Sequence, residues 1–341
     1  MAGVRVGSEG AVSGTGSDLR LVPAKPLICA PVDVTFRLAP GDRPLVAAGD
    51  SVVLGAPIAQ RLRDPRLDEL TIPATATPRP GRRWTPRTEG RDGPGAGGEF
   101  VFSWRGRWRV ATGEIADPLE VPFAGIVRDV RPGTAIMIRA AGRGIRGIVA
   151  LGGPTRGRLQ AALDGELRAG ALDVGAAGAI LVVGSRVDAE TLTRARAMGV
   201  RGVIVTGLSS KERRDYLASE ARQRSALHRL PPFAVLVMEG AVRRPLAGAV
   251  QTVLTALVGH EVAIVADPPM LVFDAPSLHI PTPPVDLVRI RAGSMGGREA
   301  RFIEAIGPRR FAAGVHLEAG LVRFPDGTTA AVPLGDLERF I

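Results

Sequence analysis

AILVVGSRVDAETLTRARAMGVRGVIVTG, residues 179–207, decides the fold predicted for the middle of this 341-residue chain. The stretch begins with the apolar run 179–183, continues with a helical pattern over 188–198 and ends with a second apolar run, 200–206. Short apolar runs that alternate with helical patterns are typical of parallel strands covered by helices on both faces. The sequence therefore predicts a strand, a helix and a second, parallel strand here.

The same alternation continues toward residue 275. We expect further helices at 160–172, 210–223 and 245–259, and further strands at 233–238 and 261–266. Together these elements predict a Rossmann-like parallel α/β domain over residues 155–275. Sheets of this kind bind ligands beyond the carboxyl ends of their strands, which here are 184–186, 206–211, 239–240 and 266–267.

Polar residues at these strand ends are the candidate ligand-binding residues. They are Ser185, Gly207, Ser209, Ser210, Lys211 and Asp267. A glycine followed by serines at a helix start presents free backbone N–H groups to an anion, and Lys211 adds positive charge. A structural interpretation stays open, because Ser209 and Glu212 have the spacing of a capping box. Asp267, followed by two prolines, also suits a rigid turn.

Two segments separated in sequence characterise a second domain, predicted over residues 21–150. The first, VAAGDSVVLGAPIA at 46–59, contains a tight-turn signal at Gly49–Asp50, and the second is VPFAGIVRDVRPG at 121–133. Together they resemble the two halves of the barrel-sandwich domains that carry biotin or lipoate. The resemblance implies a β-sandwich. Because no lysine lies at the turn between the halves, it implies the non-carrier form, which serves as an interaction module.

A Pro-, Arg- and Gly-rich segment, 61–98, predicts a flexible insertion between these halves. It is followed by EFVFSWRGRWRVATGE at 99–114, which predicts two strands that turn at 105–106. The aromatic and basic residues of this hairpin are Trp104, Arg105, Arg107, Trp108 and Arg109. Interleaved tryptophans and arginines suit stacking on nucleic-acid bases. The alternative is that the aromatic rings face a small core and the arginines face solvent.

The C-terminal segment, 285–341, predicts a third domain made of strands, with a strong turn at Phe324–Gly327. Its order of strand, glycine-rich loop, strand, hairpin and closing VPLGDLE resembles an SH3-like barrel of the KOW type. The resemblance implies a small barrel and association with nucleic acid or the ribosome. Ala300 stands where the motif has glycine, and Met295 stands where it has a basic residue. These departures weaken the implied nucleic-acid function.

Gly142, Gly144 and Gly147 have the bare spacing of a dinucleotide-binding fingerprint. That fingerprint must follow a strand and open directly into a helix. Here an apolar, strand-like run follows, and the next helix is expected only from about Thr155. We therefore predict a hairpin-like turn at Gly142–Gly144 and no dinucleotide site.

The net charge of +10 has two interpretations. Residues 61–110 hold eleven arginines and six acidic residues, which accounts for half of the excess. Lys25 and Lys211 are the only lysines among 44 basic residues, as the codon bias of a GC-rich genome would produce. The charge therefore fits either that bias or binding to nucleic acid.

The remaining composition argues against several classes of site. One cysteine, Cys29, excludes an internal disulfide, and four scattered histidines make zinc and haem poor candidates, so no cofactor is expected. No apolar run is long enough for a membrane span, and residues 1–20 lack the apolar core of a signal peptide. We expect a cytoplasmic protein with a disordered tail at 1–20 and a Pro-rich linker at 276–284.

The predicted function is that of a binding, scaffold or regulatory protein with protein partners, rather than an enzyme. Small β-domains around an α/β layer without a catalytic motif favour this function, although a fold alone does not determine function. Two alternatives stay open. One is a nucleic-acid- or ribosome-associated protein, and the other is an enzyme or enzyme subunit that binds a small anionic ligand at the α/β domain.

Overall fold

The computed structural model describes residues 18–341 except 40–41, 64–66, 71–82, 85–97, 105–106, 112–114, 162–173, 185–186, 227–229 and 243. The chain is a mixed α/β and β protein that consists mostly of β-sheet. It divides into two compact units. Unit 1 comprises the described residues of Met1–Val32, Gly142–Gln223 and Pro231–Ile341, and unit 2 those of Asp33–Ala141 and Arg224–Leu230.

An eight-stranded sheet organises unit 1. Its order is β13 (Arg143–Arg146), β20 (Pro269–Phe273), β19 (Glu261–Ala266), β15 (Thr155–Ala161), β16 (Ala179–Val182), β17 (Gly202–Val205), β18 (Ala234–Val237) and β14 (Val149–Gly152). Strands β15 to β18 are parallel to one another, and the other four form antiparallel pairs. The predicted strands are present, but the sheet is mixed rather than parallel throughout.

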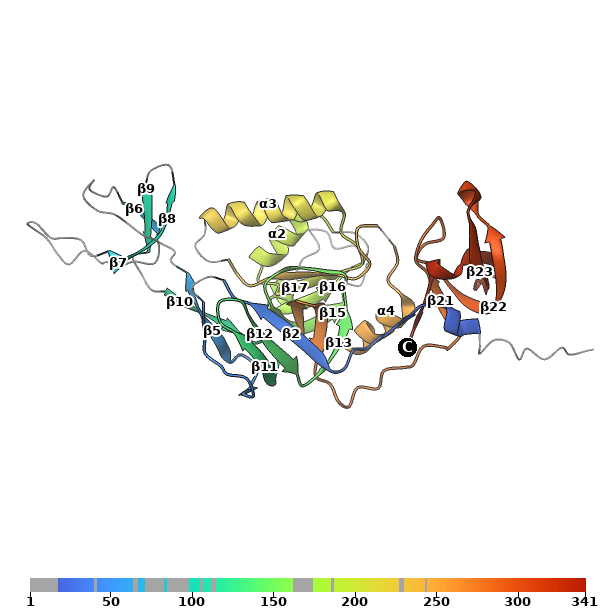
Figure 1. Ribbon diagram of the computed structural model, residues 1–341, viewed down its shortest axis with the longest axis horizontal. Helices are drawn as coiled ribbons and strands as arrows, with labels where there is room; N and C mark the ends of the chain where they lie inside the picture. The colour runs from blue at the N-terminus through green and yellow to red at the C-terminus, as the bar shows by residue number, and fades with distance from the viewer. Residues whose placement is uncertain are drawn as a thin grey trace, which may run out of the picture. The chain divides into compact units, whose positions relative to one another are not determined.

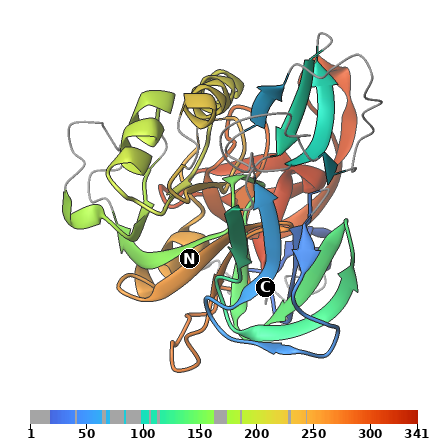
Figure 2. The same ribbon diagram turned by 90° about the vertical axis from the view of Figure 1, so that its left-hand side faces the viewer.

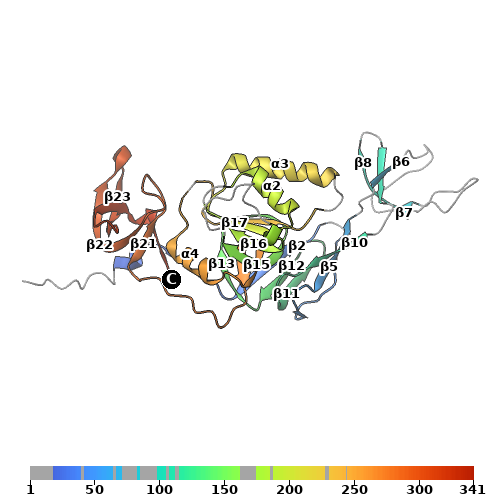
Figure 3. The ribbon, with the colours of Figure 1, turned by 180° about the vertical axis from the view of Figure 1, so that it is seen from behind.

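Helices cover both faces of the parallel strands, as the sequence predicts. Helices α2 (Ala189–Ala197) and α3 (Ser210–Ala226) lie side by side over one face, and α4 (Gly248–Ala256) lies on the other (Figures 1, 2 and 3). In β17, Val203 and Val205 join the core under α2 and α3, whereas Ile204 joins the core around α4. A continuously apolar strand thus buries alternate side chains on opposite faces.

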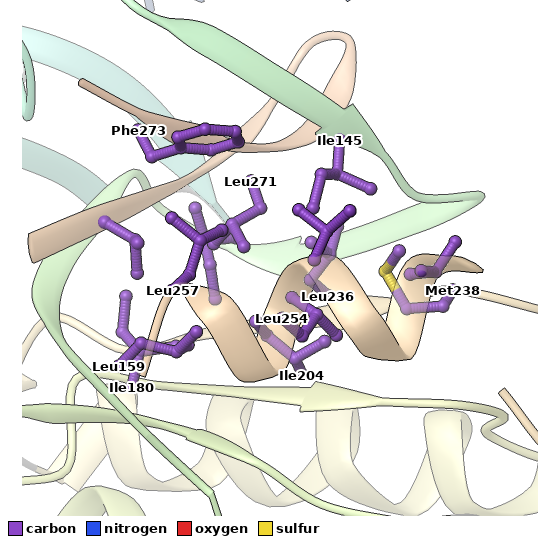
Figure 4. Packing of buried hydrophobic residues seen from close by; sticks show 14 of the residues in the cluster. Ile145, Leu159, Ile180, Ile204, Leu236, Met238, Leu254, Leu257, Leu271 and Phe273 are labelled. Carbon is purple, nitrogen blue, oxygen red and sulfur yellow. The ribbon is translucent and has the colours of Figure 1, made fainter. Parts of the chain in front are cut away.

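The sheet curls around α4. Phe273 and Ile145 lie on one side of this helix and Ile180 and Ile204 on the other (Figure 4). The helix itself contributes Val250, Val253, Leu254 and Leu257, which have the spacing of one helical face. Helix α4 is therefore held between two parts of the same sheet.

The glycines with fingerprint spacing lie in and beside β13, so the predicted hairpin-like turn is wrong. A Cβ added at Gly142 would lie 2.2 Å from the carbonyl oxygen of Phe273, and one added at Gly147 would lie 2.6 Å from Cδ1 of Leu236. Glycine is required at residue 142 because the bend before β13 passes so close to the backbone of the neighbouring strand. No helix follows Gly147 directly, in agreement with the absence of a fingerprint.

Residues 155–161 form β15 instead of the start of a helix, so that expectation is also wrong. This strand pairs in parallel with β16 and antiparallel with β19. Its alternate residues are buried, and Leu159 is fully buried. The predicted helix 160–172 overlaps the end of this strand and otherwise lies outside the described residues.

Unit 2 contains two small antiparallel sheets. One has the order β2 (Val32–Arg37), β12 (Ala135–Ala140), β11 (Gly125–Arg131) and β4 (Ser51–Val52), and the other β10 (Ile115–Glu120), β5 (Pro57–Arg63) and β3 (Arg43–Pro44). The two segments that the sequence paired do meet. The Gly49 N–H donates to the Val127 carbonyl at 2.8 Å, and the Val121 N–H donates to the Ala56 carbonyl at 3.0 Å. The type of domain stays a prediction.

A further four-stranded sheet in unit 2 has the order β6 (Leu67–Leu70), β9 (Arg107–Ala111), β8 (Gly98–Trp104) and β7 (Arg83–Trp84). Strands β8 and β9 are the two strands predicted from EFVFSWRGRWRVATGE. Strands β6 and β7 fall inside segment 61–98, where the sequence predicted only a flexible insertion. Its first residues, 61–63, end β5, and residue 98 begins β8. The rest of the insertion and the turn at 105–106 lie outside the described residues.

The C-terminal sheet of unit 1 has the order β1 (Ala24–Lys25), β25 (Leu337–Phe340), β21 (Leu287–Ile290), β22 (Glu299–Arg310), β23 (His316–Arg323) and β24 (Thr329–Pro333). The predicted turn is present, since the Gly327 N–H donates to the Phe324 carbonyl at 3.0 Å. An unexpected contribution comes from the N-terminal segment. Leu19, predicted in a disordered tail, is buried in the core of this sheet, and β1 pairs in parallel with β25.

Candidate functional site

A cavity of about 550 Å³ lies in unit 1, where the carboxyl end of β18 approaches the C-terminal sheet. Its lining includes four cationic side chains, Lys25, Arg244, Arg289 and Arg291. It also includes three anionic side chains, Glu239, Asp336 and Glu338. The cavity is therefore polar, with a small excess of positive charge.

Arg289 is the most deeply buried of these charged residues. It lies in β21 between Val288 and Ile290, which face the core of the C-terminal sheet, so its own side chain is directed to the other face. That side chain is only 3% exposed. Strand β21 therefore has its apolar side in the sheet's core and its single charged side chain at the cavity.

The guanidinium of Arg289 connects the C-terminal sheet to the α/β sheet. Its Nη1 donates to Glu239 Oε2 at 2.6 Å, and its Nη2 donates to the Pro245 carbonyl at 2.6 Å. Glu338 Oε1, from the neighbouring strand β25, lies 3.5 Å from the same Nη1. Removing one partner of such a buried pair leaves the other uncompensated, which is strongly destabilising.

One donor of Arg289 is left over. Its Nε is buried and has no hydrogen-bond partner in the described part of the chain. A buried donor without a partner costs about 1–3 kcal/mol.

The other cations surround the cavity from separate elements. Lys25 comes from β1, and its Nζ lies 5.7 Å from the centre of the Phe340 ring. Arg244 precedes α4, and its Nη1 donates to the backbone carbonyl of Arg291. Arg291 follows β21, is 56% exposed at its side chain and has its Nε 3.9 Å from Glu338 Oε2.

Asp336 completes the charged lining. It ends a short 3-10 helix, η5 (Leu334–Asp336), and its backbone carbonyl accepts a 2.6 Å hydrogen bond from the Arg291 N–H. The twelve lining residues include no Ser, Thr, Tyr, Cys or His. The arrangement is suited to holding an ionic ligand between two sheets.

The predicted anion site at the end of β17 is arranged differently. Gly207 is buried, and a Cβ added to it would lie 2.9 Å from the Val242 carbonyl oxygen. The next N–H, of Leu208, donates to the Gly240 carbonyl at 2.9 Å. This strand end therefore packs against the loop that follows β18.

Ser209 acts as a helix cap, as the structural interpretation predicts. Its Oγ accepts from the Glu212 N–H at 3.2 Å, while Glu212 Oε2 accepts from the Ala189 N–H at the start of α2. Ser210 and Lys211 are exposed on the first turn of α3. Anion binding at Gly207, Ser209, Ser210 and Lys211 stays a prediction.

The structure does not place Asp267 or Ser185 with the residues at the end of β17. Asp267 lies in the turn between β19 and β20, and β19 is antiparallel to β15, so the argument from parallel strand ends does not apply to it. Ser185 lies outside the described residues.

The tryptophan–arginine hairpin is described only at its backbone. Trp104 pairs with Arg107 and Ser103 pairs with Trp108 across β8 and β9, and Arg109 follows in β9. Arg105 lies outside the described residues. Both interpretations of this hairpin stay predictions.

No protein-family model matches the sequence, and a comparison with curated proteins finds no similar sequence. Among the described residues, no group of three or more His, Cys, Asp or Glu side chains is placed to hold a metal ion. No described helix is both long and apolar enough to cross a membrane. The functional argument therefore depends on the cavity itself.

The sequence analysis identified one of the segments that line this cavity and did not identify the others. Glu239 belongs to a strand end that the sequence singled out, but Lys25, Arg289 and Arg291 come from segments assigned to other domains. The only signal for Arg289 was its position in VDLVRIRAG, where one arginine interrupts a strand of apolar residues.

Proposed function

We propose that the chain is a ligand-binding protein and that the cavity at the carboxyl end of β18 is its ligand site. The observation that carries this proposal is a cavity lined by charged side chains from two sheets, among them the buried guanidinium of Arg289 and the exposed one of Arg291. The volume also supports it, since ligand pockets typically measure roughly 300–1,000 Å³.

The position of the cavity suits a regulatory binding protein. A ligand there would contact the α/β sheet through Glu239 and Arg244 and the C-terminal sheet through Arg289 and Arg291. Its binding free energy would strengthen the association of the two sheets, as any ligand stabilises the state that it binds. That coupling supports the binding or regulatory role expected from the sequence, with protein partners that respond to the liganded state.

A thermal-shift experiment with the small-molecule fraction of a cell extract tests this function. We expect wild-type protein to be stabilised, by about 2.7 kcal/mol when the ligand is in hundredfold excess over its Kd. Ala292→Trp, which fills the cavity, should abolish the stabilisation. Ala331→Trp, at an exposed position of β24 away from the cavity, should retain it.

Two results would contradict the proposal. One is the absence of any shift for wild-type protein across extracts from several growth conditions. The other is an equal shift for wild type and Ala292→Trp, which would locate binding elsewhere on the chain.

A further inference from the structure

We propose that the ligand is a small organic acid with one carboxylate, a single net negative charge and a neutral hydrogen-bond donor such as a hydroxyl group. This inference rests on the proposed function and specifies the chemistry of the same site. It depends on three observations: the charge of the lining, the guanidinium groups at the cavity rim and the position of Asp336.

The charge of the lining favours a single negative charge on the ligand. Among the described residues, the four cations and three anions of the lining give a formal charge of +1. One carboxylate brings the site to neutrality. A phosphate monoester carries nearly two negative charges at pH 7, and its excess charge would be placed close to the buried carboxylates of Glu239 and Glu338. Like charges held close together in a buried site repel strongly.

The donors of the lining define where the carboxylate binds. Both Nη atoms of Arg289 already face protein acceptors and its Nε is closed off from solvent, so the exposed guanidinium of Arg291 is the donor available to a ligand oxygen. The hydrogen bond from Arg244 to the Arg291 carbonyl keeps a second guanidinium beside residue 291. A carboxylate has two oxygens, which suit the two guanidinium groups at the rim.

Asp336 accounts for the donor group of the ligand. Of the three acidic residues in the lining, it is the one that does not contact Arg289. In the described part of the chain its carboxylate has no ion pair, and the residue is half-buried at the cavity. A hydroxyl group on the ligand would supply the missing donor.

Fractionation of the stabilising extract tests the ligand class. We expect the stabilising activity to be removed by an anion-exchange resin and to survive treatment with alkaline phosphatase. Loss of the activity after phosphatase would identify a phosphate monoester, and activity that passes the resin would identify an uncharged or cationic ligand. Either result would overturn this inference and leave the proposed function intact. An inactive starting extract would contradict the proposed function itself.

Variants at the cavity rim test the assignment of roles, using the ligand isolated from the active fraction. Arg291→Gln and Asp336→Asn should each weaken binding by roughly tenfold, the effect of losing one hydrogen bond to a charged group. Arg301→Gln, at an exposed position on β22, is the matched control and should leave the affinity unchanged. These positions avoid Arg289, whose removal would leave Glu239 buried and unpaired.

The chemical identity of the isolated ligand tests which functional groups it carries. Mass spectrometry should find one carboxylate and at least one hydroxyl group. A ligand without a carboxylate, or affinities of the rim variants equal to that of Arg301→Gln, would contradict the inference.

Discussion

Arg289 gives the two faces of strand β21 different environments. Its neighbours Val288 and Ile290 pack into the C-terminal sheet, and the alternation of a strand then directs the arginine to the opposite face. There it meets Glu239 from a different sheet. A sequence can reveal the alternation, but the identity of a partner fifty residues away depends on how the two sheets pack.

A second arginine–carboxylate pair, in unit 2, gives a prediction about pH. Arg139 donates two 2.8 Å hydrogen bonds to Asp33. The hydrogen bond from Arg139 lowers the pKa of Asp33. Because the folded pKa lies below the unfolded value of about 3.9, the pair stabilises the fold above that value. The contribution is lost as the pH falls through the folded pKa.

Replacing Asp33 should therefore have a pH-dependent effect. Both side chains are more than a third exposed, 39% for Arg139 and 38% for Asp33, so solvent screens the pair. Asp33→Asn should lower the free energy of unfolding by less than about 1 kcal/mol at pH 7. Urea unfolding of unit 2 should show this difference shrinking below about pH 4. A difference that grows in acid would contradict the assigned direction.

At the scale of elements, the strands 179–183, 200–206 and 233–238 were predictable because continuous apolar runs between helical patterns are characteristic of buried parallel strands. Strands β13 and β15 were not. Both are interrupted by glycine and arginine and lack an apolar period, so the sequence favoured a turn at one and a helix at the other. Both segments are strands because they pair with neighbouring strands of the sheet, and their own residue pattern does not indicate it.

Helix α4 provides the prediction at this scale. Leu254 is 2% exposed and packs in the core between the two parts of the curled sheet. Leu254→Ala should reduce the free energy of unfolding of unit 1 by about 2–5 kcal/mol, because the cavity left in a close-packed core cannot fully collapse. Leu217→Ala, on the exposed face of α3, should cost no more than about 0.5 kcal/mol. Equal losses of unfolding free energy for the two variants would show that α4 is not packed between two parts of the sheet.

At the scale of the whole molecule, the candidate site could not be read from the sequence because its walls come from both ends of the chain. The N-terminal strand β1 joins the C-terminal sheet, which places Lys25 beside Arg289 across more than 260 residues of sequence. Sequence reasoning instead favoured residues 207–211, which are close together along the chain. The strand pairing of unit 1 brings these residues together, whereas the pattern of neighbouring residues along the sequence does not indicate that they meet.

Hydrogen–deuterium exchange of the whole chain, with and without the stabilising fraction, compares these two locations directly. We predict that the ligand slows exchange in the peptides that contain the lining residues Glu239, Arg244 and Arg291, and leaves 207–213 at the start of α3 unchanged. Protection confined to 207–213 would contradict the account and restore the strand-end site predicted from the sequence.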